Sequence, residues 1–267
     1  IGIWALVLQQ LLYHFINCLV LFLQERWIPR LVFNGKRGSE LFDFGWKILV
    51  CNILDQGYLG AYDLVIGAQF SAGQLGFVSQ GKKYPSALGG MLDGAIQPVM
   101  MSAISKVQSD MGQVKRLMRR ALKTSTFIVV PFMTLFAIAA QPIVLLLLGE
   151  QWINCVPFLQ MYCFVYALLP IHSSNLSALS GMGRTDINLK LEIIKKCIGS
   201  AALIFGAFIA HDIYVLVAMA MLTGIIATVI NAWPNKRVIS YFYLEQVHDI
   251  CPAFLLSAVA GALAWVV

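Results

Sequence analysis

The sequence predicts an all-α membrane protein, a polytopic bundle of about eight transmembrane helices. Hydrophobic residues make up 59% of the chain and charged residues only 12%, whereas soluble proteins carry about 25% charged residues. At a mean hydropathy of +0.77, the apolar excess is too large for one soluble core with a polar surface. The sequence lacks segments of alternating polarity with the length of barrel strands, so we expect helices to cross the bilayer.

The individual spans follow from the rule that about 20 mostly apolar residues cross the hydrocarbon core. The segments that satisfy it are 1–23, 44–68, 85–105, 124–148, 156–179, 193–210, 213–232 and 250–267. The weakest is 193–210, because Lys195 and Lys196 stand near its start and are expected to extend to the headgroups. Pro170 lies within 156–179 and is expected to bend that helix.

The charges in the loops predict the orientation of the chain. If residue 1 lies outside the cytoplasm, the inside loops hold nearly all of the 19 lysine and arginine residues. The outside loops hold only Lys82 and Lys83, and Lys47 falls within a span. This distribution follows the positive-inside rule, which supports both the number of spans and an outside position for residue 1.

One inside loop carries a basic amphipathic pattern over residues 109–123. Apolar residues at helical spacing form one face, and lysine and arginine residues fill the other face. Such a helix would lie on anionic lipid, or it would be a solvated linker helix without a lipid role. The sequence leaves both interpretations open.

Several functional classes are disfavoured by composition and spacing. The net charge of +6 is explained by orientation and by contact with anionic lipids, so nucleic acid is not an expected partner. The six cysteines lack metal-site spacing and mostly fall in apolar stretches, and the four histidines form no metal-site pattern. No pairing of a nucleophile with a base is recognisable. We therefore expect no enzyme activity, no metal and no cofactor.

The span 44–68 is polar on one half of its surface and apolar on the other. Lys47, Asp55, Tyr58, Tyr62 and Asp63 belong to the polar half. Charges inside a bilayer usually face a bundle interior or a water-filled cavity. We therefore expect this helix to line a cavity. Lys47 and Asp55 are roughly 12 Å apart along the helix, so each needs water or a partner from another helix.

The following spans offer further polar groups. Asp93 and Gln97 share a helix face, and Gly90 and Gly94 on the same helix are expected to permit close packing. Asn175 lies in a polar half-helix that follows Pro170, and bent helices with polar ends are common in transporters. Alternatively, these polar groups only join helices by hydrogen bonds.

Three stretches resemble one family of transporters. The sequence is similar to the polysaccharide flippases, the Wzx-type exporters of the multidrug/oligosaccharidyl-lipid/polysaccharide (MOP) superfamily, and most similar to the colanic acid exporter branch. The stretches that carry this resemblance are YDLVIGAQFSAGQLGFVSQG (62–81), LLGEQWINCVPFLQ (147–160) and SNLSALSGMGRTDINLKLEIIKK (174–196).

The resemblance implies two six-helix lobes around a central cavity, the arrangement of the MATE-type extruders. Residues 1–23 would be the last helix of the first lobe, and 24–43 a cytoplasmic linker between the lobes. Residues 44–233 would form the six-helix second lobe, and 234–267 a loop with the start of an additional helix pair. The chain would then be a C-terminal fragment that lacks most of the first lobe.

The resemblance also implies a function at the bacterial cytoplasmic (inner) membrane, with residue 1 on the periplasmic side. Such relatives flip oligosaccharides linked to undecaprenyl diphosphate, and polysaccharide polymerase or assembly proteins are possible partners. Lys47 is then a candidate for attracting phosphate. The other candidate substrate contacts are Tyr58, Tyr62, Gln97 and Asn175. The candidates for coupling to H+ or Na+ are Asp55, Asp63 and Asp93.

Two other functions fit the same sequence features. A cation-coupled multidrug extruder of the same superfamily would favour an acidic cavity. A non-transporting scaffold subunit of the glycan assembly machinery would not need the polar half of 44–68 for export. We expect instead that Lys47→Ala or Asp55→Asn stops export.

Overall fold

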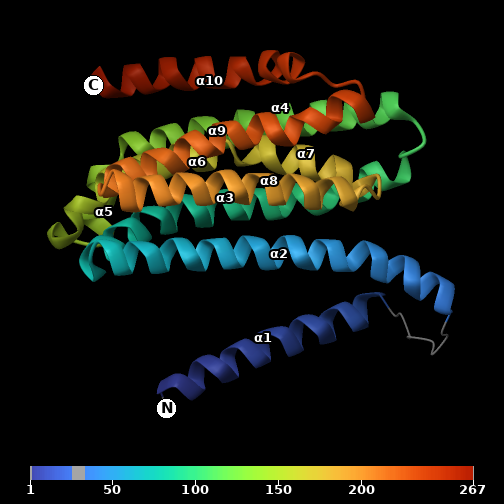
Figure 1. Ribbon diagram of the computed structural model, residues 1–267, viewed down its shortest axis with the longest axis horizontal. Coiled ribbons are helices and arrows are strands. Elements are labelled where there is room, and N and C mark those ends of the chain that lie inside the picture. Colours follow the sequence, from blue (N-terminus) through green and yellow to red (C-terminus); the bar gives the residue numbers. More distant parts are fainter. Residues whose placement is uncertain (1, 26–33, 267) are drawn as a thin grey trace. The chain divides into compact units, whose positions relative to one another are not determined.

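The computed structural model describes residues 2–25 and 34–266, which form helices joined by short loops (Figure 1). The chain divides into two compact units, 1–42 and 43–267. Of the predicted linker 24–43, residues 26–33 lie outside the described residues, and residues 35–43 are helical. No strand occurs within the described ranges, so the prediction of an all-α fold is confirmed.

The first unit contains helix α1 (Gly2–Glu25), which coincides with the first predicted span. Leu8, Leu12, Phe15 and Leu23 are among the large apolar side chains of α1 that are exposed. Residues 7–24 are long and apolar enough to cross a membrane. A helix that is apolar on all sides needs lipid or other protein around it rather than water.

The second unit contains the remaining helices and the part of α2 that follows residue 42. The long helices are α2 (Gly35–Gln69), α3 (Ala72–Lys106), α4 (Met111–Ile138), α8 (Thr185–Ile204), α9 (Ile213–Val238) and α10 (Tyr243–Val266). The shorter elements are α5 (Ala140–Leu147), η1 (Glu150–Cys155), α6 (Val156–Ala167), α7 (Leu169–Gly181) and the π-helical turn η2 (Phe205–Ile209). In Figure 1 the long helices of this unit run along one another.

Local sequence explains where several helices begin. The side chains of Ser71, Asp110 and Asp212 accept hydrogen bonds from the first backbone N–H groups of α3, α4 and α9. The hydrogen bond from the Gln113 backbone lowers the pKa of the Asp110 carboxyl. Pro170 lies in the first turn of α7, and the helix is interrupted at Leu168, between α6 and α7. The predicted span 156–179 is therefore divided into two helices just before Pro170.

The predicted spans fall on helical segments, although 124–148 and 156–179 are each divided between two helices, and not every segment is strongly apolar. Besides the span in α1, the segments long and apolar enough to cross a membrane lie in α4, in η1 to α7, in α9 and in α10. The predicted spans 44–68, 85–105 and 193–210 correspond to α2, α3 and α8 with η2, which are more polar. The number of eight transmembrane helices therefore stays a prediction.

The second unit is held together by close packing between α4 and α10 and between α3 and the pair α6 and α7. A Cβ atom on Gly81 would lie 2.8 Å from the Phe158 Cβ and 2.9 Å from the Leu159 backbone nitrogen. Only glycine therefore allows α3 and α6 to approach this closely. Gly90 and Gly94 have open space around them. Among the described residues no other helix packs closely against this pair, so the close packing that it would permit stays a prediction.

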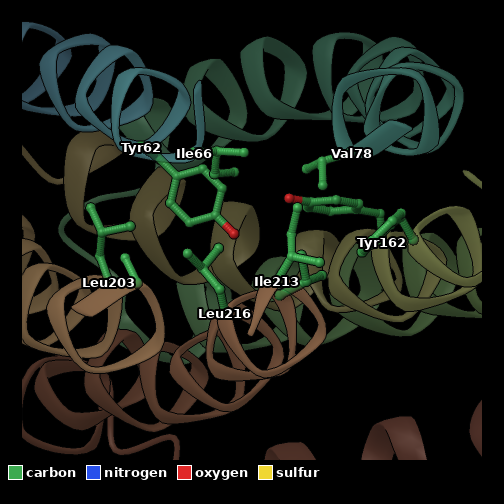
Figure 2. Packing of buried hydrophobic residues seen from close by; sticks show 10 residues of the cluster. Tyr62, Ile66, Val78, Tyr162, Leu203, Ile213 and Leu216 are labelled. Atoms are coloured by element: carbon green, nitrogen blue, oxygen red, sulfur yellow. The ribbon is translucent and has the colours of Figure 1, made fainter. Parts of the chain in front are cut away.

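One buried hydrophobic cluster joins α2 to α6, α8 and α9 (Figure 2). Its members include Tyr62 and Ile66 of α2, Tyr162 of α6, Leu203 of α8 and Leu216 of α9. A full aliphatic side chain that is buried contributes about 1.5–3 kcal/mol. The apolar residues of α2 near its C-terminal end therefore attach this polar helix to the rest of the unit.

The basic amphipathic segment 109–123 is the first part of the long helix α4. Its apolar residues Val114, Met118 and Leu122 are fully buried against Ile239 and Tyr241, which follow α9. These three residues therefore pack on protein. This corrects both sequence-based interpretations, since the segment is neither a separate helix on the membrane surface nor a solvated linker: it continues into the long helix α4, and the loop before α10 covers these residues.

Candidate functional site

A cavity of about 370 Å³ lies among α2, α3, α6, α7, α8 and α9. Four tyrosines line it, and we call it the tyrosine-lined cavity: Tyr58, Tyr62, Tyr162 and Tyr166. Its charged lining residues come from three helices: Asp55 from α2, Lys82 from α3, and Glu192, Lys195 and Lys196 from α8. These are the three helices that were too polar for the spanning criterion. Their polarity therefore has a structural explanation, since they place charge around an internal space.

Helix α2 contributes one continuous edge of the cavity. Asp55, Tyr58 and Tyr62 line it and are spaced so that they share a helix face. The rings of Tyr58 and Tyr62 lie 6.3 Å apart, centroid to centroid. In Figure 2 the side chains of Tyr62 and Tyr162 extend from different helices toward a common region. A cavity thus lies along part of the polar half of 44–68, and four of the predicted site residues line it: Asp55, Tyr58, Tyr62 and Gln97.

Lys196 is the central cation of the site. Its ammonium group forms an ion pair with Asp55 of α2 and lies 3.8 Å from the Glu192 carboxylate, one turn away on α8. The same group lies 5.0 Å from the centroid of the Tyr58 ring, within cation–π range. Lys196 therefore connects α2 to α8 through several partners at once.

Glu192 completes this arrangement. Its side chain is only 7% exposed and forms an ion pair with Lys195 in addition to its contact with Lys196. An unpaired carboxylate at such a position would carry a large desolvation cost. We call Asp55, Glu192, Lys195 and Lys196 the charge cluster.

Two features of the charge cluster differ from what the sequence suggested. Lys195 and Lys196 were expected to extend to the headgroups, but both line the cavity. Glu192 was not identified as a site residue. A signal for it was available, because Glu192, Lys195 and Lys196 are spaced by three and four residues and therefore share a face at the start of a predicted span.

A second cavity of about 350 Å³ adjoins the first. Asp55, Gln97 and Glu192 line both cavities. Along α2 the second cavity is lined from Ile48 to Asp55, and the tyrosine-lined cavity from Asp55 to Tyr62. The two cavities therefore follow one another along the bundle, and part of the charge cluster lies where they meet.

Lys47 and Asp63 lie away from this place. Lys47 is ion-paired with Asp43, one turn earlier on α2, at 2.7 Å, and it does not line either cavity. Its hydrogen bond to Asp43 lowers the pKa of that carboxyl. The expected partner of Lys47, water or another helix, is thus replaced by a neighbour on its own helix. Asp63 is exposed on the surface of α2 and lines neither cavity.

Asp93 and Asn175 occupy two other environments. Asp93 lies in a small crevice with Gln97 and Ser173. Asn175 is fully buried and lines neither cavity. Its side-chain oxygen accepts hydrogen bonds from Asn235 of α9 (2.6 Å) and Gln246 of α10 (3.2 Å), and its nitrogen donates to the Gln246 oxygen (3.0 Å). Asn175 therefore joins three helices.

Proteins with related sequences are named for the biosynthesis of succinoglycan and lipopolysaccharide. The chain is 21% identical over 206 residues to the succinoglycan biosynthesis transport protein ExoT of Rhizobium meliloti (strain 1021), covering 77% of this chain and 42% of ExoT. It is 23% identical over 261 residues to the lipopolysaccharide biosynthesis protein WzxC of Escherichia coli (strain K12), covering 95% of this chain and 53% of WzxC. The chain thus spans about half the length of these relatives.

The fold resembles that of a solved flippase. The structure of the lipid II flippase MurJ in its inward closed conformation matches with a TM-score of 0.70 and 15% sequence identity, over 89% of this chain and 50% of MurJ. At this identity the match shows that the two proteins share a fold, an all-α transporter architecture. A sequence model described as polysaccharide biosynthesis protein matches residues 1–157, more than half of the chain. The chain therefore belongs to this polysaccharide biosynthesis protein family, within the MOP superfamily that its sequence resembles.

Proposed function

We propose that the chain forms part of a transporter that flips oligosaccharides linked to undecaprenyl diphosphate across the bacterial inner membrane for surface polysaccharide biosynthesis. The observation that carries the proposal is the tyrosine-lined cavity, with its three lysines, inside a bundle that exposes many apolar side chains. The names of the relatives, which refer to biosynthesis of succinoglycan and lipopolysaccharide, support this substrate class.

The cations of the cavity suit the phosphates of such a carrier. A diphosphate that leaves water for a span of about 30 Å needs hydrogen-bond donors and positive charge to replace its hydration. Lys82, Lys195 and Lys196 supply both. Lys196 is already held by carboxylates, so a phosphate would replace Asp55 or Glu192 as its partner. The phosphate role first predicted for Lys47 stays a prediction, and its position outside the cavities favours Lys196 instead.

The tyrosines suit the sugar part. Aromatic faces combine a large apolar contact with a polar hydroxyl, which matches a sugar ring with its apolar C–H face and hydroxyl rim. Tyr58 and Tyr62 are our candidates for sugar contacts, together with Gln97 at the junction of the two cavities. A cavity of about 370 Å³ falls within the range of small-molecule sites. We propose that it takes the diphosphate with the first sugar rather than a whole oligosaccharide.

Coupling to an ion gradient is the third part of the proposal. Asp55 is the foremost candidate for taking up H+ or Na+, because its carboxylate lies at the junction of the cavities and is already paired with a movable cation. Asp93 is a second candidate, in its crevice beside Ser173. Asp63, exposed on α2, remains a third candidate that needs a partner outside the described residues.

The proposed process moves the substrate without making or breaking covalent bonds. We place residue 1 on the periplasmic side from the loop charges, and we expect polymerase or assembly proteins to receive the flipped substrate. Because the chain spans about half of its relatives, the proposal concerns the full-length transporter that contains this chain.

Deleting the gene and restoring it on a plasmid tests this function. Loss of a surface polysaccharide, with accumulation of its lipid-linked precursor on the inner leaflet, is the expected result. Unchanged polysaccharide with increased drug sensitivity would instead indicate a multidrug extruder. A scaffold role would be indicated if cavity variants of normal abundance, made at Lys196 and Tyr58, left polysaccharide yield at the wild-type level.

A further inference from the structure

An apolar groove runs between α3 and α4, apart from the two cavities described above. It measures about 390 Å³ and shares no lining residue with the tyrosine-lined cavity. Small residues keep it open, with Ala103 on α3 and Ala121 on α4 among them, and Val99 of α3 is 69% exposed beside it. The groove therefore offers an apolar channel on the outside of the unit.

Arg120 is the charged residue that lines this groove. Three neighbouring cations on α4 have protein partners: Lys115 pairs with Glu245 (2.7 Å), while Arg119 and Lys123 both pair with Asp249 (2.5 and 3.0 Å). Arg116 is exposed as Arg120 is, but it does not line the groove. Across the described residues, Arg120 forms no ion pair that would balance its charge, and its side chain is exposed. The groove thus combines an apolar wall with one uncompensated cation.

The position of Arg120 along α4 matches the boundary between headgroups and hydrocarbon. From Thr124 to the end of α4 at Ile138, the helix carries no charged residue. At 1.5 Å per residue this uncharged part is about 22 Å long, so it accounts for most of the hydrocarbon thickness. Arg120 precedes it by one turn, where a long cationic side chain reaches the phosphate level. The groove residues on α3 and α4 then extend from that level into the hydrocarbon.

We propose that this groove binds an anionic phospholipid, with its phosphate paired to Arg120 and one acyl chain lying between α3 and α4. The charge of Arg120 complements a negatively charged headgroup, and the apolar wall complements an acyl chain. The groove runs along α4 for about two turns, roughly 12 Å, a length that suits part of one acyl chain and is short for a polyprenyl tail. Because the groove is separate from the tyrosine-lined cavity, the bound lipid is distinct from the transported substrate.

Lipid binding to the full-length protein tests this proposal. The purified protein is titrated in detergent with phosphatidylglycerol or phosphatidylcholine, and bound lipid is counted by native mass spectrometry. We expect a preference for phosphatidylglycerol that Arg120→Gln reduces by about tenfold and that Arg120→Lys largely keeps. Arg116→Gln is the matched control, since Arg116 is an exposed cation one turn earlier on α4 that does not line the groove. Ala121→Phe, which fills the groove, should weaken the binding of both lipids.

Three results would overturn the proposal. Equal binding of both lipids by the wild-type protein would show that the charge of the headgroup does not contribute to binding. An equal loss in the Arg116→Gln and Arg120→Gln proteins would indicate diffuse surface charge. Displacement of phosphatidylglycerol by an equimolar polyprenyl phosphate would identify the carrier as the occupant. Melting temperatures measured in a neutral detergent confirm that each variant is folded.

Discussion

Lys196 and Asp55 lie 141 residues apart in the sequence and form an ion pair that connects α8 to α2. The pair lies where the two cavities meet, and Lys196 also approaches Glu192 and the ring of Tyr58. A cation shared by two carboxylates is held in place but exchanges partners easily, because either carboxylate can be replaced by another anion. This arrangement is therefore suited to a site that must bind a phosphate and release it again.

Removing the central cation should impair export. In the Lys196→Ala protein the Asp55 carboxylate loses its cation, and the cavity loses a positively charged hydrogen-bond donor for phosphate. We therefore expect polysaccharide export to fall by about tenfold or more at equal protein abundance. Export is measured as surface polysaccharide per cell in a deletion strain. Lys190→Ala is the control, because Lys190 is exposed on the same helix and does not line the cavity. Full export by the Lys196→Ala protein would contradict the phosphate role.

Removing the competing carboxylate should have a different effect. In the Asp55→Asn protein a phosphate no longer competes with Asp55 for Lys196, so the apparent KM for the lipid-linked substrate should decrease while turnover also decreases, because release slows. If Asp55 also couples transport to an ion gradient, the response of the rate to that gradient is lost. Both quantities are measured with the full-length protein in liposomes. An increase in KM without a change in turnover would argue against the exchange of partners.

Lys47 offers a direct contrast with Lys196. The sequence suggested that Lys47→Ala would stop export, but the structure places this side chain outside both cavities and pairs it with Asp43. An ion pair with an exposed carboxylate contributes little to stability, because water screens it. We therefore expect the Lys47→Ala protein to export near the wild-type level in the same assay. A loss as large as that of Lys196→Ala would restore the original assignment and place a phosphate contact at Lys47.

Asn175 should affect stability more than substrate binding. The Asn175→Ala substitution removes the partner of Asn235 and Gln246, both of which are fully buried. Each unsatisfied buried group costs about 1–3 kcal/mol, so we expect a clearly lower melting temperature in detergent. The KM of the remaining folded protein should be unchanged. A wild-type melting temperature with an increased KM would instead support the substrate contact predicted from the sequence.

Two glycines on α3 provide a matched test of the packing. A Cβ on Gly81 would clash with α6, and relieving such overpacking costs about 1–3 kcal/mol. A Cβ on Gly90 meets nothing within 4 Å, and alanine within a helix is favoured over glycine by about 0.5–1 kcal/mol. We therefore expect Gly81→Ala to lower the melting temperature and Gly90→Ala to leave it unchanged or raise it. The reverse order would show that α3 packs against the other helices through a different face.

The local features of this protein could be predicted from the sequence. Helix length and period depend on neighbouring residues, so the positions of the helices, the break before α7 and the polar face of α2 were all predictable. Asp55, Tyr58 and Tyr62 were identified for this reason, because one helical face carries all three. Glu192 was missed although its spacing from Lys195 and Lys196 is local, because the start of α8 was interpreted as an interface with the headgroups.

The pairing between helices was decided only by the tertiary structure. Composition and period determined that this is an all-α membrane protein with a polar helix that borders a cavity, since both follow from the apolar excess and the 3.6-residue turn. The cation that approaches Asp55 lies 141 residues away in the sequence. The amides that contact Asn175 lie 60 and 71 residues away. A helical pattern specifies the face that a side chain occupies, but its partner depends on the rotation and depth of another helix. The rotation and depth of a helix are set by close packing, as at Gly81. Because this packing involves the whole bundle, no short stretch of sequence indicates it.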